Sequence, residues 1–169
     1  MRLNADVREL RRQGAGYRLA GEGMEPLEAD AVVLACPAHA AAPITQGLAP
    51  RISELVSRVP YSPLAVVCLG YDRAAVAHPM DGFGFLVPRT AGLRILGALW
   101  TSSIFPERCG DGRVLVRVMI GGARDPEALD LSDEELTALV HGEVGAAQGI
   151  DGEPTFTRVF RHRRAIPQY

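Results

Sequence analysis

Lysine is absent from this sequence, since all 18 of its basic residues are arginine. The simplest explanation is a GC-rich genome. The acidic residues number 20, so the formal net charge at pH 7 is only −2, which excludes a strong overall field for attracting nucleic acid or an anionic membrane. No run of about 18 consecutive apolar residues occurs, so we expect no transmembrane segment. Residues 1–6 have no apolar core, and we expect no secretory leader.

Cysteine is scarce, and the sequence motifs of nucleophilic or metal-dependent catalysis are missing. The three cysteines, Cys36, Cys68 and Cys109, form no Cys-x-x-Cys pair, which favours reduced thiols and a cytoplasmic protein over disulfides or zinc. No Gly-x-Ser-x-Gly, His-Glu-x-x-His or Walker sequence occurs, and the four histidines have no ligand spacing, so we expect no metal site. Gly14-Ala15-Gly16 lacks the third glycine and the following helix of a dinucleotide-binding turn, and is interpreted as an ordinary turn.

Apolar residues are plentiful enough for a hydrophobic core. The chain has 169 residues, of which 47% are apolar and 22% are charged, values typical of a globular domain. The connections between most of the predicted strands are too short for helical crossovers, which favours antiparallel pairing. We therefore expect an α+β fold with helices flanking a mixed, largely antiparallel β-sheet. The strands of this sheet are predicted at residues 64–71, 82–88, 94–100, 113–120 and 154–160.

The helices are predicted in two regions. Residues 38–59 have helical periodicity, and Pro43 and Pro50 are expected to divide them into two short helices, because proline is tolerated in a first turn but not inside a helix. Ser132 and Glu135 match a capping box at the start of a third, longer helix.

The N-terminal segment is predicted to be rich in strands. A turn at residues 13–16 indicates a hairpin, and residues 29–37 then form a continuous apolar run that ends at a proline. Such a run is typical of a strand that is buried on both faces.

Three segments, residues 82–88, 96–105 and 118–124, combine glycines with large apolar side chains. Sheet core joined by tight turns explains this pattern most simply. The alternative is a cavity wall, in which glycine lets a flat ligand approach the backbone and aliphatic side chains cover its faces. The composition of these segments leaves both interpretations open.

Taken together, these segments resemble the flavin amine oxidase superfamily and, within it, the protoporphyrinogen oxidase family. Residues 29–37 are similar to the strand that returns to the FAD domain in that superfamily. The segments that narrow the resemblance match the family's order and spacing along nearly the whole chain. They are Gly82–Pro88, Leu96–Pro106, Met119–Asp125 and Ile166–Tyr169.

The resemblance implies an activity and a set of site residues. Family members oxidise a porphyrinogen to a porphyrin in haem biosynthesis, removing six electrons through FAD with oxygen as the usual acceptor; some bacterial relatives act on coproporphyrinogen. Because the flavin supplies this chemistry, no catalytic residue is expected. The backbone of Val7 would meet the adenine end of FAD. The residues that would line the substrate pocket facing the flavin are Phe83, Gly84, Leu86, Leu99 and Met119.

The resemblance also implies a division into domains. Residues 1–37 would be a partial segment of the FAD-binding domain, residues 38–160 the substrate-binding domain, and residues 161–169 the truncated start of the return to the FAD domain. The family's Gly-rich FAD fingerprint and its C-terminal flavin segment have no counterpart here, so we expect a fragment that is inactive alone.

The expected partners are a porphyrinogen and either the missing FAD-binding portion or a second copy of the chain. The expected reaction is the oxidation of protoporphyrinogen IX to protoporphyrin IX. Peripheral membrane attachment, known in the family, is left open. So are three alternatives: a non-catalytic tetrapyrrole-binding module, half of a split flavoenzyme, and another flavin amine oxidase.

Overall fold

The computed structural model describes residues 1–168, so Tyr169, the last residue of the Ile166–Tyr169 motif, lies outside the described residues. The chain forms two compact units. The N-terminal unit comprises Met1–Pro60 together with Gln168, and the sheet unit comprises Tyr61–Pro167. These units are defined by packing, whereas the domain boundaries expected at residues 37 and 160 concern the parts of a larger flavoenzyme and stay a prediction.

A small antiparallel sheet forms the first half of the N-terminal unit. It consists of β1 (Asp6–Gln13), β2 (Gly16–Glu22) and β3 (Leu27–Ala29), with β2 in the centre. The predicted hairpin is confirmed, since β1 and β2 are joined through Gly14, whose φ of 57° is a left-handed conformation that glycine adopts without strain.

The predicted doubly buried strand at residues 29–37 is wrong. β3 ends at Ala29, no strand follows before the first helix, and Val33 is 90% exposed. A continuous apolar run forms a buried strand only where neighbouring strands pair with it on its two edges. None of the described strands pairs with residues 31–37, so the apolar run here does not determine a strand.

Two short helices complete the N-terminal unit, as predicted. They are α1 (Ala38–Thr45) and α2 (Pro50–Ser57), and Pro50 lies in the first turn of α2. Pro43 does not separate the helices, however, because it lies inside α1 near its C-terminal end. A proline there removes only one backbone hydrogen bond from an eight-residue helix. The apolar face of α2 has no cover within this unit, and its Leu55 is 49% exposed.

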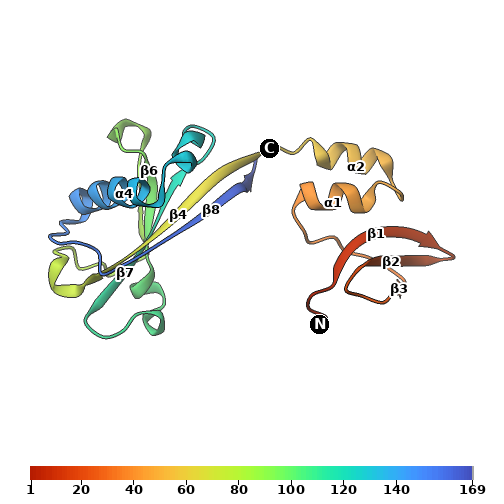
Figure 1. Ribbon diagram of the computed structural model, residues 1–169, viewed down its shortest axis with the longest axis horizontal. Coiled ribbons are helices and arrows are strands. Elements are labelled where there is room, and N and C mark those ends of the chain that lie inside the picture. Colours follow the sequence, from red (N-terminus) through yellow and green to blue (C-terminus); the bar gives the residue numbers. More distant parts are fainter. Residues whose placement is uncertain (169) are drawn as a thin grey trace. The chain divides into compact units, whose positions relative to one another are not determined.

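The sheet unit contains five antiparallel strands in the order β5-β6-β7-β4-β8 (Figure 1). The last strand continues to Pro167, well beyond its predicted end at residue 160, because the start of β4 pairs with it: Tyr61 lies opposite Pro167 and Ser62 opposite Ile166. The strands are β4 (Tyr61–Asp72), β5 (Gly84–Leu86), β6 (Ile95–Trp100), β7 (Arg113–Gly121) and β8 (Phe156–Pro167).

Side chains alternate strictly along the central strands, so the two faces of this sheet differ. One face, called the covered face below, packs against the long helix α4 (Asp133–Gln148) and carries the core (Figure 1). A shorter helix, α3 (Thr101–Ile104), follows β6. The fully buried core residues of the two central strands and α4 are Ala65, Val67, Leu69, Tyr71, Val116, Val118, Ile120, Leu136, Val140 and Val144. The opposite face is called the open face.

Polar contacts fix α4 against the sheet. The predicted capping box is present, with the Ser132 hydroxyl accepting from the Glu135 N–H and the Glu135 carboxylate accepting from the Ser132 N–H. Near the other end of α4, the Glu143 carboxylate accepts from the backbone N–H groups of Arg94 and Ile95, 2.9–3.0 Å away. The capping box therefore stabilises the start of α4, and Glu143 ties the helix to the start of β6.

Replacing Leu136 in α4 should destabilise the sheet unit strongly. Leu136 is completely buried, so Leu136→Ala is expected to lower the free energy of unfolding by about 2–5 kcal/mol. Trp100 is the only tryptophan and is buried in this unit, so its fluorescence during urea unfolding measures the change. The exposed neighbour Glu134 supplies the control: Glu134→Gln should change stability by no more than about 0.5 kcal/mol. Equal effects of the two substitutions would contradict the packing described for α4.

Candidate functional site

The open face of the five-stranded sheet brings together four of the five predicted substrate-binding residues. Strand pairing places Leu86 of β5 opposite Gly97 of β6, and Gly97 opposite Met119 of β7. The same row continues across the sheet to Val66 and Phe160. Residues in one row of an antiparallel sheet point to the same face, so Leu86 and Met119 flank Gly97 on a common surface.

The next row on this face contains the other two. Gly84 lies opposite Leu99, and Leu99 lies opposite Arg117. The row then continues to Cys68 and Arg158. Leu86, Leu99 and Met119 therefore converge on one surface.

Glycines at two positions allow β5 and β6 to approach each other closely. A Cβ atom at Gly97 would lie 2.4 Å from the Phe85 carbonyl oxygen, and one at Gly84 would lie 1.9 Å from the Ala98 carbonyl oxygen. Both distances are far below van der Waals contact, so the close approach of β5 and β6 requires glycine at both positions. Gly97 itself is buried, and a methyl group of Leu86 lies 3.2 Å from the position of its missing Cβ, so the Leu86 side chain packs over this glycine.

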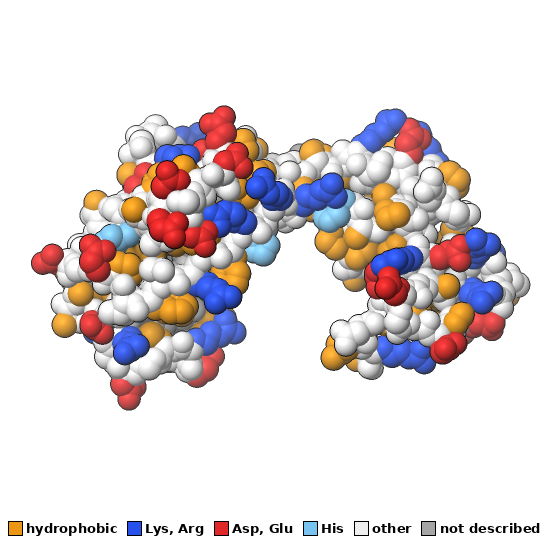
Figure 2. All heavy atoms as spheres, viewed as in Figure 1, with side chains coloured by type: hydrophobic (Ala, Val, Ile, Leu, Met, Phe, Trp, Pro, Cys, Tyr) orange, Lys and Arg blue, Asp and Glu red, His pale blue; other side chains and the backbone are white. Residues whose placement is uncertain are grey.

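Much of the open face remains exposed and apolar. Leu86 is 83% exposed, Leu99 and Met119 are half-buried, and Phe156 and Phe160 of β8 are 50% and 45% exposed. Figure 2 shows hydrophobic side chains at the surface of the sheet unit beside basic ones, and acidic side chains gathered over α4. A contiguous apolar sheet face of this kind is typical of a surface that binds a ligand or a second polypeptide.

Two predicted site residues lie apart from these rows. Phe83 precedes β5, outside the paired residues, and its side chain is 77% exposed while its carbonyl oxygen accepts from the Trp100 N–H. Val7 belongs to the N-terminal unit, where it is half-buried on β1, opposite Gly21 and next to an irregularity in the pairing.

The structure adds polar residues that sequence reasoning did not select. Cys68 lies between Arg117 and Arg158 in its row, and burial raises the pKa of its thiol while the charge of Arg117 lowers it to a smaller extent. The thiol therefore stays protonated at neutral pH and does not neutralise either guanidinium group. In the sequence, Arg113 and Arg117 are spaced so that both lie on the same side of one strand. This spacing was the available signal for Arg117, but it does not show which face of the sheet is covered.

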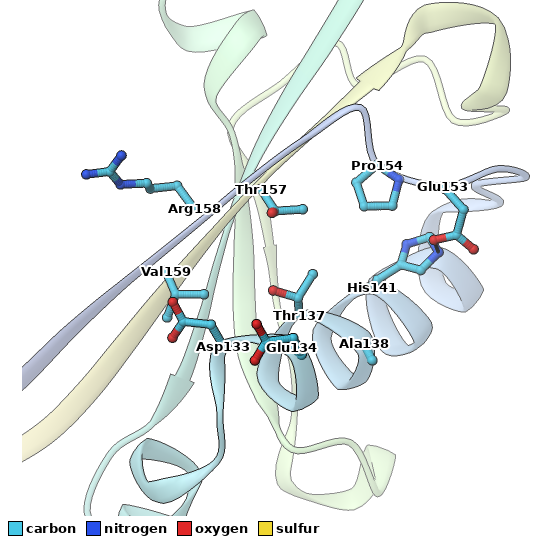
Figure 3. A pocket seen from close by; sticks show the side chains of 10 residues that line it. All are labelled: Asp133, Glu134, Thr137, Ala138, His141, Glu153, Pro154, Thr157, Arg158 and Val159. Carbon is cyan, nitrogen blue, oxygen red and sulfur yellow. Dashed lines mark ion pairs between the residues drawn. The ribbon is translucent and has the colours of Figure 1, made fainter.

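A separate groove lies on the covered side, between α4 and the start of β8 (Figure 3). It has a volume of about 670 Å³. The carboxylates of Asp133, Glu134 and Glu153 line it, together with the side chain of Arg158. His141 lines the groove, and its Nδ1 lies 3.0 Å from the hydroxyl of the buried Tyr71, whose pKa burial raises well above its ordinary value. This contact ties β4 to α4.

The described residues fit a bound flavin only in part. Gly14-Ala15-Gly16 lies in the β1–β2 hairpin, with a strand and not a helix after it, so it cannot bind a pyrophosphate at a helix N-terminus. β1 is an edge strand of its three-stranded sheet, so backbone groups on its outer edge, including those near Val7, are unpaired within that sheet. Residues 1–168 therefore offer a backbone edge and an apolar face, but no phosphate-binding turn.

Three further features concern the described part of the chain as a whole. No group of three or more His, Cys, Asp or Glu side chains within residues 1–168 is arranged to hold a metal ion. None of the helices found there has the length and apolarity that crossing a bilayer requires. All three cysteines are free thiols.

Comparison with known proteins gives a consistent result. The chain is 32% identical over 163 residues to coproporphyrinogen III oxidase of Bacillus subtilis (strain 168), a match that covers 96% of this chain and 34% of that protein. It is 34% identical over 123 residues to the mitochondrial protoporphyrinogen oxidase of Nicotiana tabacum, covering 71% of this chain and 24% of the relative. The chain thus spans about a third or less of the length of these relatives.

Solved structures agree on the fold. A variant of putrescine oxidase superposes with a TM-score of 0.69 at 19% identity, covering 92% of this chain and 34% of that one. The family model described as flavin containing amine oxidoreductase matches residues 1–168, which is nearly the whole sequence. The chain therefore belongs to the flavin-containing amine oxidoreductase family.

Proposed function

We propose that this chain supplies the substrate-binding sheet of an FAD-dependent porphyrinogen oxidase, an enzyme that oxidises protoporphyrinogen IX to protoporphyrin IX, or the coproporphyrinogen equivalent, in haem biosynthesis. The observation that carries the proposal is the arrangement of Leu86, Leu99 and Met119 on one open sheet face around Gly97. The names of the relatives from Bacillus subtilis and Nicotiana tabacum support it.

The open face has the physical properties that a porphyrinogen ring requires. The ring is large and mostly apolar, so its transfer from water onto Leu86, Leu99 and Met119 is favourable. At about 25 cal/mol per Å², burial of roughly 200 Å² of apolar area would contribute roughly 5 kcal/mol.

The role of these residues is to position the ring and exclude water. Oxidation is the chemistry that a flavin supplies when it is bound, so the protein needs no acid–base pair on this face. Apolar side chains on one side of the ring leave its other side free. Phe83 and Gly84, at the start of β5, would lie at the margin of the ring in the same proposal.

The flavin site itself would be completed by polypeptide other than these 169 residues. Two observations support this part of the proposal: residues 1–168 contain no phosphate-binding turn, and the chain spans about a third or less of its named relatives. Residues 1–37 would then belong to an FAD-binding domain, with the backbone at Val7 near the adenine, and residues 38–160 to the substrate domain. The chain alone would be inactive.

Tetrapyrrole binding tests the assignment of the open face. Titration of the 169-residue chain with coproporphyrin III, a stable oxidised product, is expected to shift the Soret band of the porphyrin. Leu86→Asp places a charge against the ring and should weaken binding roughly ten-fold or more. Leu55→Asp on α2, an exposed leucine of the N-terminal unit, should leave the affinity unchanged. The proposal fails if both variants bind as the wild type does, or if the wild type does not bind.

Flavin content tests the proposed division of the cofactor site. The purified 169-residue chain is expected to carry no stoichiometric FAD and to show no porphyrinogen oxidation, because it contributes only part of the cofactor's surroundings. The flavin absorption spectrum and a porphyrin fluorescence assay measure the two properties. Retention of one FAD per chain through gel filtration would contradict the proposal, whereas tetrapyrrole binding without flavin would support it.

A further inference from the structure

The strand β6 contains a bulge at Leu96, close to its start. Ile95 lies opposite Ile120 of β7 and Gly97 lies opposite Met119, so β6 advances by two residues where β7 advances by one. Leu96 is the extra residue. Because side chains alternate along a strand, an extra residue reverses the alternation, and the part of β6 after the bulge faces the opposite way from a regular continuation.

The bulge lets both parts of β6 contribute to the same core. Ile95 is buried there before the bulge, and Ala98 and Trp100 are buried there after it. In a regular strand, residues separated by an odd number of positions point to opposite faces, so Ile95 could not share a face with Ala98 and Trp100. With Ile95 fixed in the core, a strand without the bulge would turn Leu99 to the covered face. The bulge therefore allows Leu99 to lie on the open face.

A carboxylate from α4 holds the backbone directly before the bulge. Glu143 Oε2 accepts from the backbone N–H groups of Arg94 and Ile95, with N···O distances of 3.0 and 2.9 Å, and Oε1 shares the Arg94 N–H at 3.0 Å. Glu143 is followed in α4 by Val144, which is fully buried, so core packing fixes the point from which the carboxylate reaches β6. Hydrogen bonds to a charged acceptor are also stronger than those between neutral groups.

The side chain of Arg94 connects the same corner to the end of β7. Its guanidinium group donates to both oxygens of the Asp125 carboxylate, at 2.8 and 2.9 Å. Asp125 follows the end of β7, the strand with which the start of β6 pairs. Arg94 is thus held through its backbone by Glu143 and through its side chain by Asp125.

Apolar burial alone does not select the bulged arrangement over its nearest competitor. In the competing register, Leu96 would take the place of Ile95 opposite Ile120, and β6 would be a regular strand. Leucine and isoleucine have similar volume and hydrophobicity, so the core discriminates only weakly between them. The hydrogen bonds from Glu143 to the backbone at Ile95 favour the bulged arrangement.

The hairpin that adjoins the bulge carries part of the proposed substrate surface. Strand β5 has three residues and lies at the edge of the five-stranded sheet, paired with β6. Leu86 lies opposite Gly97, the first paired residue after the bulge, and the Val87 N–H donates to the carbonyl oxygen of Leu96 at 3.0 Å. The positions of Leu86 and Leu99 therefore depend on the conformation of the bulge.

We infer that Glu143 is a positioning residue for the proposed substrate-binding face. Its carboxylate holds the bulge at Leu96, and the bulge holds the hairpin that presents Leu86 and Leu99. The inference rests on the proposed function and extends that site to a residue on the other side of the sheet. Glu143 belongs to α4 on the covered side, so it acts through the backbone of β6 and takes no part in the oxidation.

Two substitutions of Glu143 test the inference in the 169-residue chain. Glu143→Ala removes the acceptor and should weaken coproporphyrin III binding, measured by Soret titration, roughly five-fold or more. Glu143→Gln removes the charge but keeps one oxygen. Because Oε2 alone accepts from both N–H groups, this variant should restore the affinity to within about two-fold of the wild type.

Ser132→Ala is the matched control, because it removes a side-chain hydrogen bond at the other end of α4. Both Ser132→Ala and Glu143→Ala should lower the midpoint of thermal unfolding, followed by Trp100 fluorescence. The affinity of Ser132→Ala for coproporphyrin III is expected to stay within about two-fold of the wild type. This comparison separates an effect on β6 from a general loss of stability.

Hydrogen–deuterium exchange reports on the hairpin itself. In Glu143→Ala, the backbone amides of residues 83–99 should exchange at least several-fold faster than in the wild type, whereas those of residues 156–160 in β8 should not change. Glu143→Gln and Ser132→Ala should both retain the wild-type exchange of residues 83–99.

The outcomes distinguish failure of this inference from failure of the proposed function. If the wild type binds coproporphyrin III and Glu143→Ala binds it as Ser132→Ala does, the role of Glu143 is overturned and the proposed function stands. The role is also overturned if Glu143→Gln loses as much affinity as Glu143→Ala, or if the exchange of residues 83–99 does not respond to Glu143→Ala. If the wild type does not shift the Soret band, the proposed function fails, and the role of Glu143 in binding fails with it.

Discussion

The structure of the sheet unit depends on the burial of one face of its five-stranded sheet beneath α4. Leu136, Val140 and Val144 of α4 are fully buried against the alternate residues of β4 and β7. Because successive side chains of a strand point to opposite faces, that single packing event determines the orientation of every other side chain. Leu86, Leu99 and Met119 lie on the open face for this reason.

The strands and the long helix of the sheet unit could be predicted from the sequence, whereas parts of the N-terminal unit could not. The capping box at Ser132 and the partial alternation along residues 113–120 are local signals, and the structure contains the helix and the strand that they predict. The apolar run at residues 29–37 failed as a predictor, because a strand buried on both faces needs neighbours that no described residue provides. The prediction that Pro43 separates two helices failed for a different reason. The helix α1 is so short that the loss of one hydrogen bond does not divide it.

The candidate site could be predicted only in part. Family resemblance selected Gly84, Leu86, Leu99 and Met119, and strand pairing brings them together in two adjacent rows. Arg117, Cys68 and Arg158 were missed because they are far apart in sequence, and only the register of β7, β4 and β8 makes them neighbours. The question whether the glycine-rich segments form core or cavity wall has a mixed answer, since each strand contributes one face to the core and the other to the open surface.

Cys68 offers the most direct test of the claim that a tetrapyrrole lies on the open face. It lies half-buried between the two arginines, whereas Cys36 is an exposed thiol of the N-terminal unit, so the two serve as probe and internal reference. Because the pKa of Cys68 is raised, alkylation is best followed at alkaline pH, by mass spectrometry of each peptide. Saturating coproporphyrin III is expected to slow alkylation of Cys68 at least several-fold and to leave Cys36 unchanged. An unchanged Cys68 rate under saturating ligand would contradict the account.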